Sequence, residues 1–123
     1  MKRDLDLVRT ILKEIEGRAA GDFARGLSIE GRTQAEVDEH VRIMIDANLL
    51  DGEPRTMVQC GYEPTFIRGI SWHGHDFLDA ARDDSIWKKV REKVVKAAGS
   101  MAFDVVVDLL KAEGKSRLGL GKD

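Results

Sequence analysis

TQAEVDEHVRIMIDANLLDGEPRTMVQCGYEPTFIRGISWHGHDFLDAA, residues 33–81, is the stretch that decides the fold of this 123-residue chain. Its first part has the periodicity of a helix, its middle holds two short runs typical of strands, and its end opens another helix. A helix, a β-ribbon and a second helix in this order form the core of a winged helix. The pattern therefore predicts a mainly helical α+β fold with a winged-helix-like core, a β-hairpin wing and additional C-terminal helices.

The first helix of this stretch has clear signals at both ends. Thr33 and Glu36 form a T-x-x-E capping box, in which each side chain binds a backbone N–H of the first turn. Asn48 favours the left-handed conformation that closes a helix, so Leu49 and Leu50 are expected to enter the core directly after it. The residues expected on the buried side of the helix are Val37, Val41, Met44 and Ile45.

The middle of the stretch predicts the wing. Residues 56–58 and 66–70 are compatible with strands, and CGYEP between them supplies the Gly and Pro of a turn. We therefore expect these two strands to pair as a hairpin. A third helix then starts at Ser71 or Trp72 and is expected to bury Phe77, Leu78 and Ala81.

Helices are also expected on both sides of this stretch. A helix over residues 4–16, capped by Asp4, precedes a Gly-rich loop with a candidate strand at 27–29. Two more helices follow, one capped within residues 83–85 and ending at Gly99, and one from Ser100 to Gly114. The predicted division is a winged-helix-like core at 1–82, a helical extension for oligomerisation at 83–114, and a flexible tail at 115–123.

Composition bounds the class of protein. Hydrophobic residues make up 42% and charged residues 34%, which is typical of a soluble globular domain. Lys plus Arg is 20 and Asp plus Glu is 22, so the net charge of -2 gives no global attraction to nucleic acid. Cys60 is the only cysteine, which excludes an internal disulfide and suits a reducing compartment. No signal-peptide or membrane-spanning pattern is present, so we expect a cytoplasmic protein without membrane contact.

Three segments are similar to a known family: MKRDLDLVRTILKEIE at the start, EVDEHVRIMIDANLLDG in the middle, and SWHGHDFLDAARDDSIWKKV after it. Together they resemble the bacterial and phage family known as domain of unknown function 2513. The resemblance covers most of residues 1–98 and is most specific in SWHGHDFLDAARDDSIW. It implies a small winged-helix domain with extra C-terminal helices in a prokaryotic or phage setting, and it implies no catalytic residue. Asn48 stands where winged helices often have Gly.

The helix that would read DNA is acidic. Glu36, Asp38, Glu39 and Asp46 outnumber Arg42 on it, so it would be repelled by phosphate in ordinary major-groove docking. A contact led by the wing and by basic groups elsewhere stays open. The candidate nucleic-acid-binding residues are Arg25, Arg32, Arg55 and Arg68 on the loop and wing, and Lys88, Lys89, Arg91, Lys93 and Lys96 on a basic ridge. DNA binding predicts that all of them share one face.

Catalytic and metal chemistry have little support. His73, His75 and Asp76 are types that bind transition metals, but their spacing matches no standard site. We expect His75 to pack under the wing with a hydrogen bond to backbone, and His73 to be exposed. Motifs of serine hydrolases, P-loops and dinucleotide sites are absent. We therefore expect no enzyme activity, no metal and no cofactor; an enzyme would need convergence of His40, Cys60, His73, His75 and Asp76.

Two features bear on partners. Trp72 and Trp87 flank the third helix, and we expect both in the core rather than at a partner surface. The last helix is apolar on most sides, more than a small domain can cover, which predicts a homodimer. The residues expected at the dimer interface are Met101, Phe103, Val106, Val107 and Leu110.

These observations favour a non-enzymatic prokaryotic or phage regulatory or adaptor protein of winged-helix type, with DNA as one candidate ligand. The alternative is a protein–protein interaction module without DNA binding, such as a phage protein that binds and inhibits a host factor. Retention on duplex DNA that weakens with salt would distinguish the two, because phosphate contacts depend on counterion release.

Overall fold

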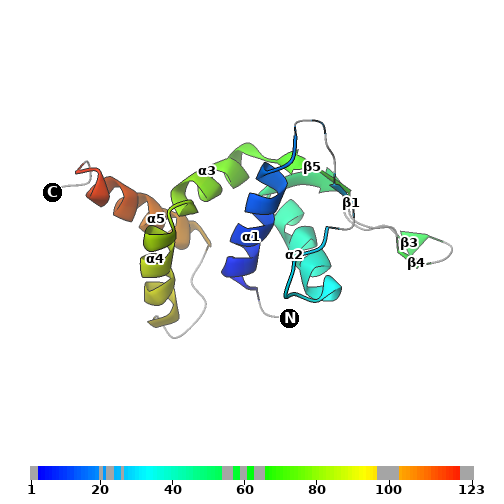
Figure 1. Ribbon diagram of the computed structural model, residues 1–123, viewed down its shortest axis with the longest axis horizontal. Helices are drawn as coiled ribbons and strands as arrows, with labels where there is room; N and C mark the ends of the chain where they lie inside the picture. The colour runs from blue at the N-terminus through cyan, green and yellow to red at the C-terminus, as the bar shows by residue number, and fades with distance from the viewer. Residues whose placement is uncertain are drawn as a thin grey trace. The chain divides into compact units, whose positions relative to one another are not determined.

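The computed structural model describes residues 3–19, 21, 24–25, 27–53, 57–58, 61–62, 66–96 and 103–119. Its elements are α1 (Leu5–Glu16), β1 (Ala24–Arg25), α2 (Gln34–Asp46), β2 (Leu50–Glu53), β3 (Met57–Val58), β4 (Gly61–Tyr62), β5 (Phe66–Ile70), α3 (Trp72–Ala81), α4 (Asp84–Lys96) and α5 (Phe103–Arg117), as Figure 1 shows. The predicted mainly helical α+β fold is confirmed. The chain divides into two compact units, Met1–His75 and Asp76–Asp123.

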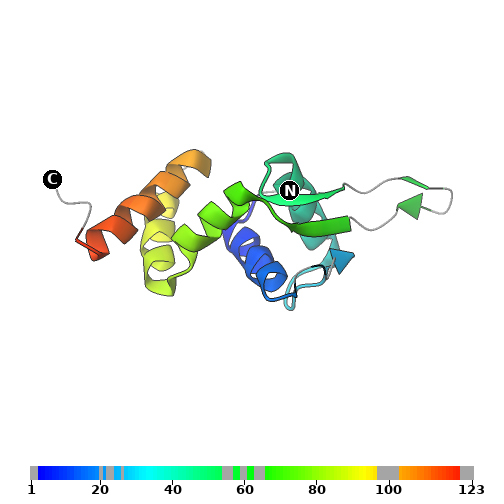
Figure 2. The same cartoon turned by 90° about the horizontal axis from the view of Figure 1, so that it is seen from above.

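The first unit is built on a three-stranded antiparallel sheet in the order β1-β5-β2. In the pairing of β2 with β5, Leu50 lies opposite Ile70 and Glu53 opposite Phe66, with a bulge between Asp51 and Gly52. A Cβ added at Gly52 would overlap the carbonyl oxygen of Phe66, so this close approach of the two strands requires glycine. Helices α1 and α2 pack on each other and against this sheet (Figures 1 and 2).

The predicted strand pairing is wrong. Strand β5 was expected to pair with residues 56–58, but its partners are β1 and β2, whereas β3 pairs with β4 in a separate two-stranded ribbon. The physical reason is that β2 follows directly from the end of α2 and buries Leu50, which anchors β5 beside it. The predicted strand at 27–29 is also wrong, because the short strand in this region is β1.

The cap predictions for α1 and α2 are confirmed. The Asp4 carboxylate accepts hydrogen bonds from the backbone N–H groups of Asp6 (2.9 Å) and Leu7 (3.3 Å) at the start of α1. At the start of α2, both halves of the capping box between Thr33 and Glu36 are present. Asn48 closes α2 with φ 62°, and the leucines after it are buried.

His40 fixes the two helices to each other. It is 1% exposed, and among the described residues it is the one buried polar side chain. Its Nε2 atom lies 2.9 Å from the backbone N–H of Asp4, which can only donate, so Nε2 accepts. Its Nδ1 atom therefore carries the proton and donates to the carbonyl oxygen of Glu36 at 2.8 Å. A neutral imidazole thus ties the cap of α1 to the body of α2.

The second unit has an aromatic core. Phe77 is fully buried and contacts Trp87 edge-on, with ring centroids 5.9 Å apart and planes at 87°. Phe103 also contacts Phe77, with ring centroids 5.0 Å apart and planes at 35°. Helices α4 and α5 pack on each other. The other buried residues of this unit are Leu78, Ala81, Val90, Val106, Val107 and Leu110.

Helix α5 is longer than predicted. It was expected to stop at Gly114, but it continues through this residue to Arg117. Gly114 does not adopt the positive φ with which glycine ends a helix, and Lys115 and Arg117 complement the dipole of the last turn. Among the helices that the structure describes, none combines the length and the hydrophobicity that crossing a bilayer requires.

Candidate interaction surfaces

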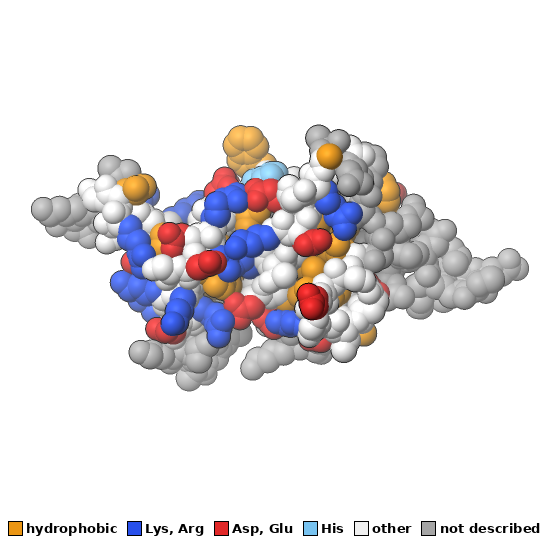
Figure 3. Space-filling view, viewed as in Figure 1, with side chains coloured by type: hydrophobic (Ala, Val, Ile, Leu, Met, Phe, Trp, Pro, Cys, Tyr) orange, Lys and Arg blue, Asp and Glu red, His pale blue; other side chains and the backbone are white. Residues whose placement is uncertain are grey.

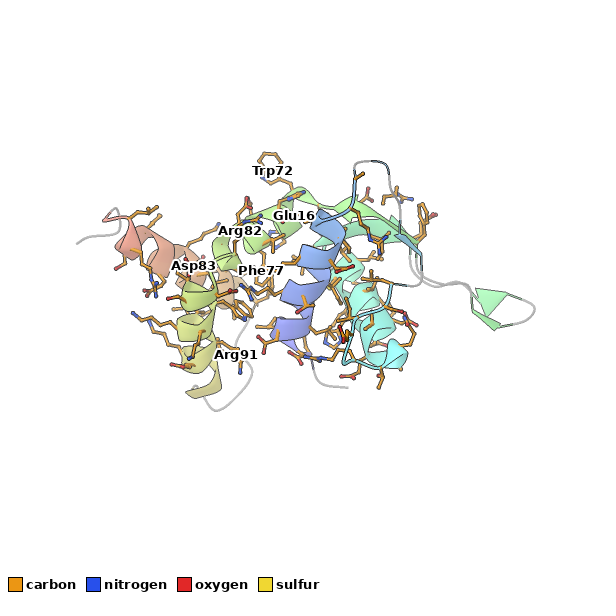
Figure 4. The ribbon with its side chains drawn as sticks, viewed as in Figure 1. Glu16, Trp72, Phe77, Arg82, Asp83 and Arg91 are labelled. Carbon is orange, nitrogen blue, oxygen red and sulfur yellow. The ribbon has the colours of Figure 1, made fainter. Side chains whose placement is uncertain are left out.

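Trp72 is the large apolar side chain most exposed to solvent in the described part of the chain. It is 85% exposed, and it points outward from the start of α3 (Figure 4). The expectation that Trp72 lies in the core is therefore wrong, whereas the same expectation for Trp87, 5% exposed, is confirmed. The reason is its position: Trp72 is the first residue of its helix, and Phe77 and Leu78 take the buried side about one and a half turns later.

The backbone beneath Trp72 is held by several contacts. The N–H of Ser71 donates to the carbonyl oxygen of Leu49 at 3.1 Å, and the Ser71 hydroxyl donates to the carbonyl oxygen of Asn48. The same hydroxyl accepts from the N–H of Gly74 at 3.0 Å, so Ser71 caps α3. A Cβ added at Gly74 would overlap the carbonyl oxygen of Leu49. Trp72 therefore projects from a rigid base.

The histidine segment differs from the prediction. His75 is exposed rather than packed under the wing, and His73 is half-buried rather than exposed. The reason is the helical phase of α3, in which Gly74 and Phe77 face inward and His75 faces out. Within the described ranges, no group of three or more His, Cys, Asp or Glu side chains is placed to hold a metal ion. Cys60 lies outside the described residues.

Three arginines of the first unit form ion pairs with carboxylates of the same unit. Arg32 lies 2.8 Å from Asp4 and 3.6 Å from Glu36. Arg68 on β5 pairs with Glu53 at 3.3 Å and with Asp51 at 3.5 Å. Arg42 pairs with Glu39 and Asp46 on its own helix. These exposed pairs contribute little stability, but they leave the three arginines less free to bind phosphate.

The ion pair of Arg32 perturbs the cap of α1. Partial burial acts to raise the pKa of the Asp4 carboxyl, but the hydrogen bond from Arg32 and those from the N–H groups of Leu7 and Asp6 outweigh it. The net result is a pKa below the usual value. Asp4 is therefore a charged cap that also orders Arg32.

The basic ridge on α4 is exposed but partly neutralised. Lys88 and Lys93 have no ion-pair partner among the described residues, whereas Lys89 pairs with Glu113 at 3.2 Å. Glu113 also accepts from Arg117 at 3.2 Å, and the hydrogen bonds from Arg117 and Lys89 lower its pKa. Figure 3 shows Lys and Arg side chains gathered over α4 and α5.

Three of the predicted nucleic-acid-binding side chains lie outside the described part of the chain. Arg55 lies outside the described residues, as do the side chains of Arg25 in β1 and Lys96 at the end of α4. That all the basic residues share one face stays a prediction.

The predicted dimer face is largely covered within the chain. Val106 is 1% exposed, Val107 6% and Leu110 0%, and Phe103 is half-buried against Phe77. Met101 lies outside the described residues. A dimer through these residues stays a prediction, but the surplus apolar surface that suggested it is small.

Comparisons with known proteins identify the family. Residues 2–101 match the family described as hypothetical protein (DUF2513). The chain belongs to this family. An uncharacterized protein of Haemophilus influenzae is 26% identical over 111 residues, which are 86% of this chain and 89% of that protein. No solved structure matches this chain.

Proposed function

We propose that this family member is a non-enzymatic regulatory or adaptor protein of winged-helix type that binds a protein partner through the surface around Trp72. The order of elements supports the winged-helix part: α1, β1, α2, β2 and β5 follow one another, β5 lies between β1 and β2, and the β3–β4 ribbon is inserted where a wing would stand. The relative in Haemophilus influenzae supports a bacterial setting.

The observation that carries the proposal is the exposure of Trp72. Burying an indole against a partner removes a large apolar surface from water, and tryptophan is enriched among residues that dominate binding energy. A side chain on a rigid base also loses little backbone freedom on binding. Trp72 meets both conditions, since the contacts of Ser71 with Asn48 and Leu49 hold the chain beneath it.

The charges of the first unit support a protein partner over duplex DNA at α2. The exposed side of α2 carries Asp38, Glu39 and Asp46, and Arg42 is already paired with two of these groups. Phosphate would have to compete with carboxylates for Arg42, Arg32 and Arg68 alike. Non-specific DNA affinity comes mainly from such cations, so this surface offers little of it.

Differential capture tests the proposal. Tagged wild-type protein and a Trp72→Ala variant are incubated with a lysate of the organism that encodes the chain, and bound proteins are quantified by mass spectrometry. We expect a partner that the variant binds about 30-fold more weakly, since a hot-spot residue contributes about 2 kcal/mol or more. Val105→Ala, at a valine that is 43% exposed elsewhere, is the matched control. Identical capture by wild type and Trp72→Ala would contradict the proposal.

A second candidate function is nucleic-acid binding by the ridge on α4. The specific observation is that Lys88 and Lys93 are exposed and lack ion-pair partners among the described residues. It predicts that the wild type is retained on duplex DNA at low salt and that Lys88→Glu with Lys93→Glu abolishes this retention. No retention at low salt, or retention that the double variant leaves unchanged, would remove this candidate.

A further inference from the structure

A groove of about 390 Å³ lies in the second unit, among α3, α4 and α5. Its apolar part is formed by Ala80, Ile86 and Leu110. Acidic side chains of α3 and of the junction with α4 line one part of it: Asp76, Asp79 and Asp83. Basic side chains of α5 line another: Lys111 and Lys115. One surface thus offers an apolar centre with both signs of charge around it.

Some of these charges already have a role within the chain. Asp79 pairs with Arg82 at 2.8 Å, and Asp83 caps α4 by accepting from the N–H groups of Ser85 and Ile86. Asp76, Lys111 and Lys115 have no ion-pair partner among the residues that the structure describes. The groove therefore presents free charges of opposite sign that do not satisfy each other within one chain.

Gly114 also lines the groove, and no contact among the described residues requires glycine at this position. It lies within α5, where glycine is less favourable than alanine. A Cβ added there would meet no atom within 4 Å, and its backbone does not adopt a positive φ. Leu118 follows α5 directly, its N–H donates to the carbonyl oxygen of Gly114 at 3.1 Å, and it is 74% exposed. Close approach by another molecule would explain both residues.

We infer that the occupant of this groove is the end of α5 from a second copy of this chain. In a twofold dimer each contact occurs twice, so a surface with both charge signs can complement itself. Lys111 and Lys115 of each copy would meet Asp76 of the other. Leu118 of the partner subunit would cover the apolar part of the groove, and the two α5 helices would approach closely at Gly114. This contact does not involve the partner surface around Trp72, so either proposal can fail without the other.

Reciprocal charge reversal tests this dimer. Mass in solution is measured by sedimentation or light scattering over a concentration series for four samples: the wild type, Lys111→Glu with Lys115→Glu, Asp76→Lys, and a mixture of the two variants. The wild type should dimerise and each variant should be monomeric. The mixture should dimerise again, because opposite charges then meet at both contacts. A monomeric wild type, variants that dimerise like the wild type, or a mixture that stays monomeric would overturn the inference.

A larger side chain at Gly114, where the two α5 helices would approach closely, gives a second test. Gly114→Leu should block the dimer, and it should not impair folding because leucine favours helix. Ala112→Leu is the matched control, since Ala112 is exposed on α5 but does not line the groove. It should leave the mass unchanged, as should Trp72→Ala. A dimer that survives Gly114→Leu, with circular dichroism showing an intact helix, would overturn the inference.

Discussion

The two units of the chain use their charged side chains differently. In Met1–His75, Arg32, Arg42 and Arg68 all lie in ion pairs with carboxylates of the same unit. In Asp76–Asp123, Arg82, Lys89 and Arg117 are paired in the same way, but Lys111 and Lys115 stay unpaired among the described residues. The first unit therefore offers an aromatic contact with neutralised surroundings, and the second offers free charge. This difference indicates two kinds of recognition in one small chain.

The two tryptophans give the largest expected contrast between the units. Trp87→Ala should destabilise the fold by about 4 kcal/mol, because it removes a buried aromatic side chain and its edge contact with Phe77. Trp72→Ala should change stability by less than about 0.5 kcal/mol, since it is a surface substitution. Urea unfolding followed by circular dichroism measures both. A large loss of stability in Trp72→Ala would show that this side chain is structural.

The next largest effect concerns the histidine between α1 and α2. His40→Ala should cost about 3 kcal/mol, because it leaves a cavity and removes the partners of the Asp4 N–H and the Glu36 carbonyl. His75→Ala is the control, and its exposed position predicts a change within about 0.5 kcal/mol. Equal stability of the two variants would mean that His40 does not connect the helices.

Two helix glycines sharpen the comparison further. Gly74→Ala should destabilise by about 2 kcal/mol, because the added Cβ would overlap the carbonyl oxygen of Leu49. Gly114→Ala should stabilise the monomer by about 1 kcal/mol, since the site is open within one chain and alanine favours helix. Melting temperatures of the two variants should move in opposite directions. If the melting temperature moved in the same direction in both variants, either the close packing at Gly74 in α3 or the open space beside Gly114 in α5 would be contradicted.

The smallest expected effect is that of the α1 cap. Asp4→Ala should cost about 1 kcal/mol at neutral pH through loss of the cap, whereas Asp4→Asn keeps a capping oxygen and should cost less. The folded pKa of Asp4 lies below its unfolded value, so its ionised form stabilises the fold above the unfolded pKa. This contribution is lost as pH falls through the folded pKa. The stability difference between wild type and Asp4→Asn should therefore shrink with acidification, and a constant difference would contradict the charged cap.

Sequence reasoning recovered what depends on local signals. The caps at Asp4, Thr33 and Asp83 follow from side chains that bind nearby backbone, and the positive φ of Asn48 from its tolerance of that conformation. The buried side of α3 followed from helical periodicity. Such features depend only on a few residues that are neighbours in the sequence, so they can be predicted from the sequence alone.

Features that depend on distant contacts were missed. The pairing of β5 with β2 requires knowing that Leu50 is buried and lies opposite Ile70, and a two-residue strand such as β4 leaves no periodic pattern. Trp72 and Trp87 look alike in sequence, and only the packing of Phe77 decides which is buried. His40 did have a signal, since it lies on the apolar stripe of α2 between Val37 and Val41. The groove among α3, α4 and α5 had no signal in the sequence, because it arises from the packing of three helices.

The central claim is that the Trp72 side chain is exposed to solvent in the folded chain. Acrylamide quenching of its fluorescence tests this claim most directly. A Trp87→Phe variant keeps an aromatic ring in the core and leaves Trp72 as the sole tryptophan. The account predicts emission at the wavelength of hydrated indole and quenching close to that of free tryptophan, with circular dichroism showing the folded state. Blue-shifted emission that acrylamide barely quenches would contradict it, since Trp72 would then be covered within the chain.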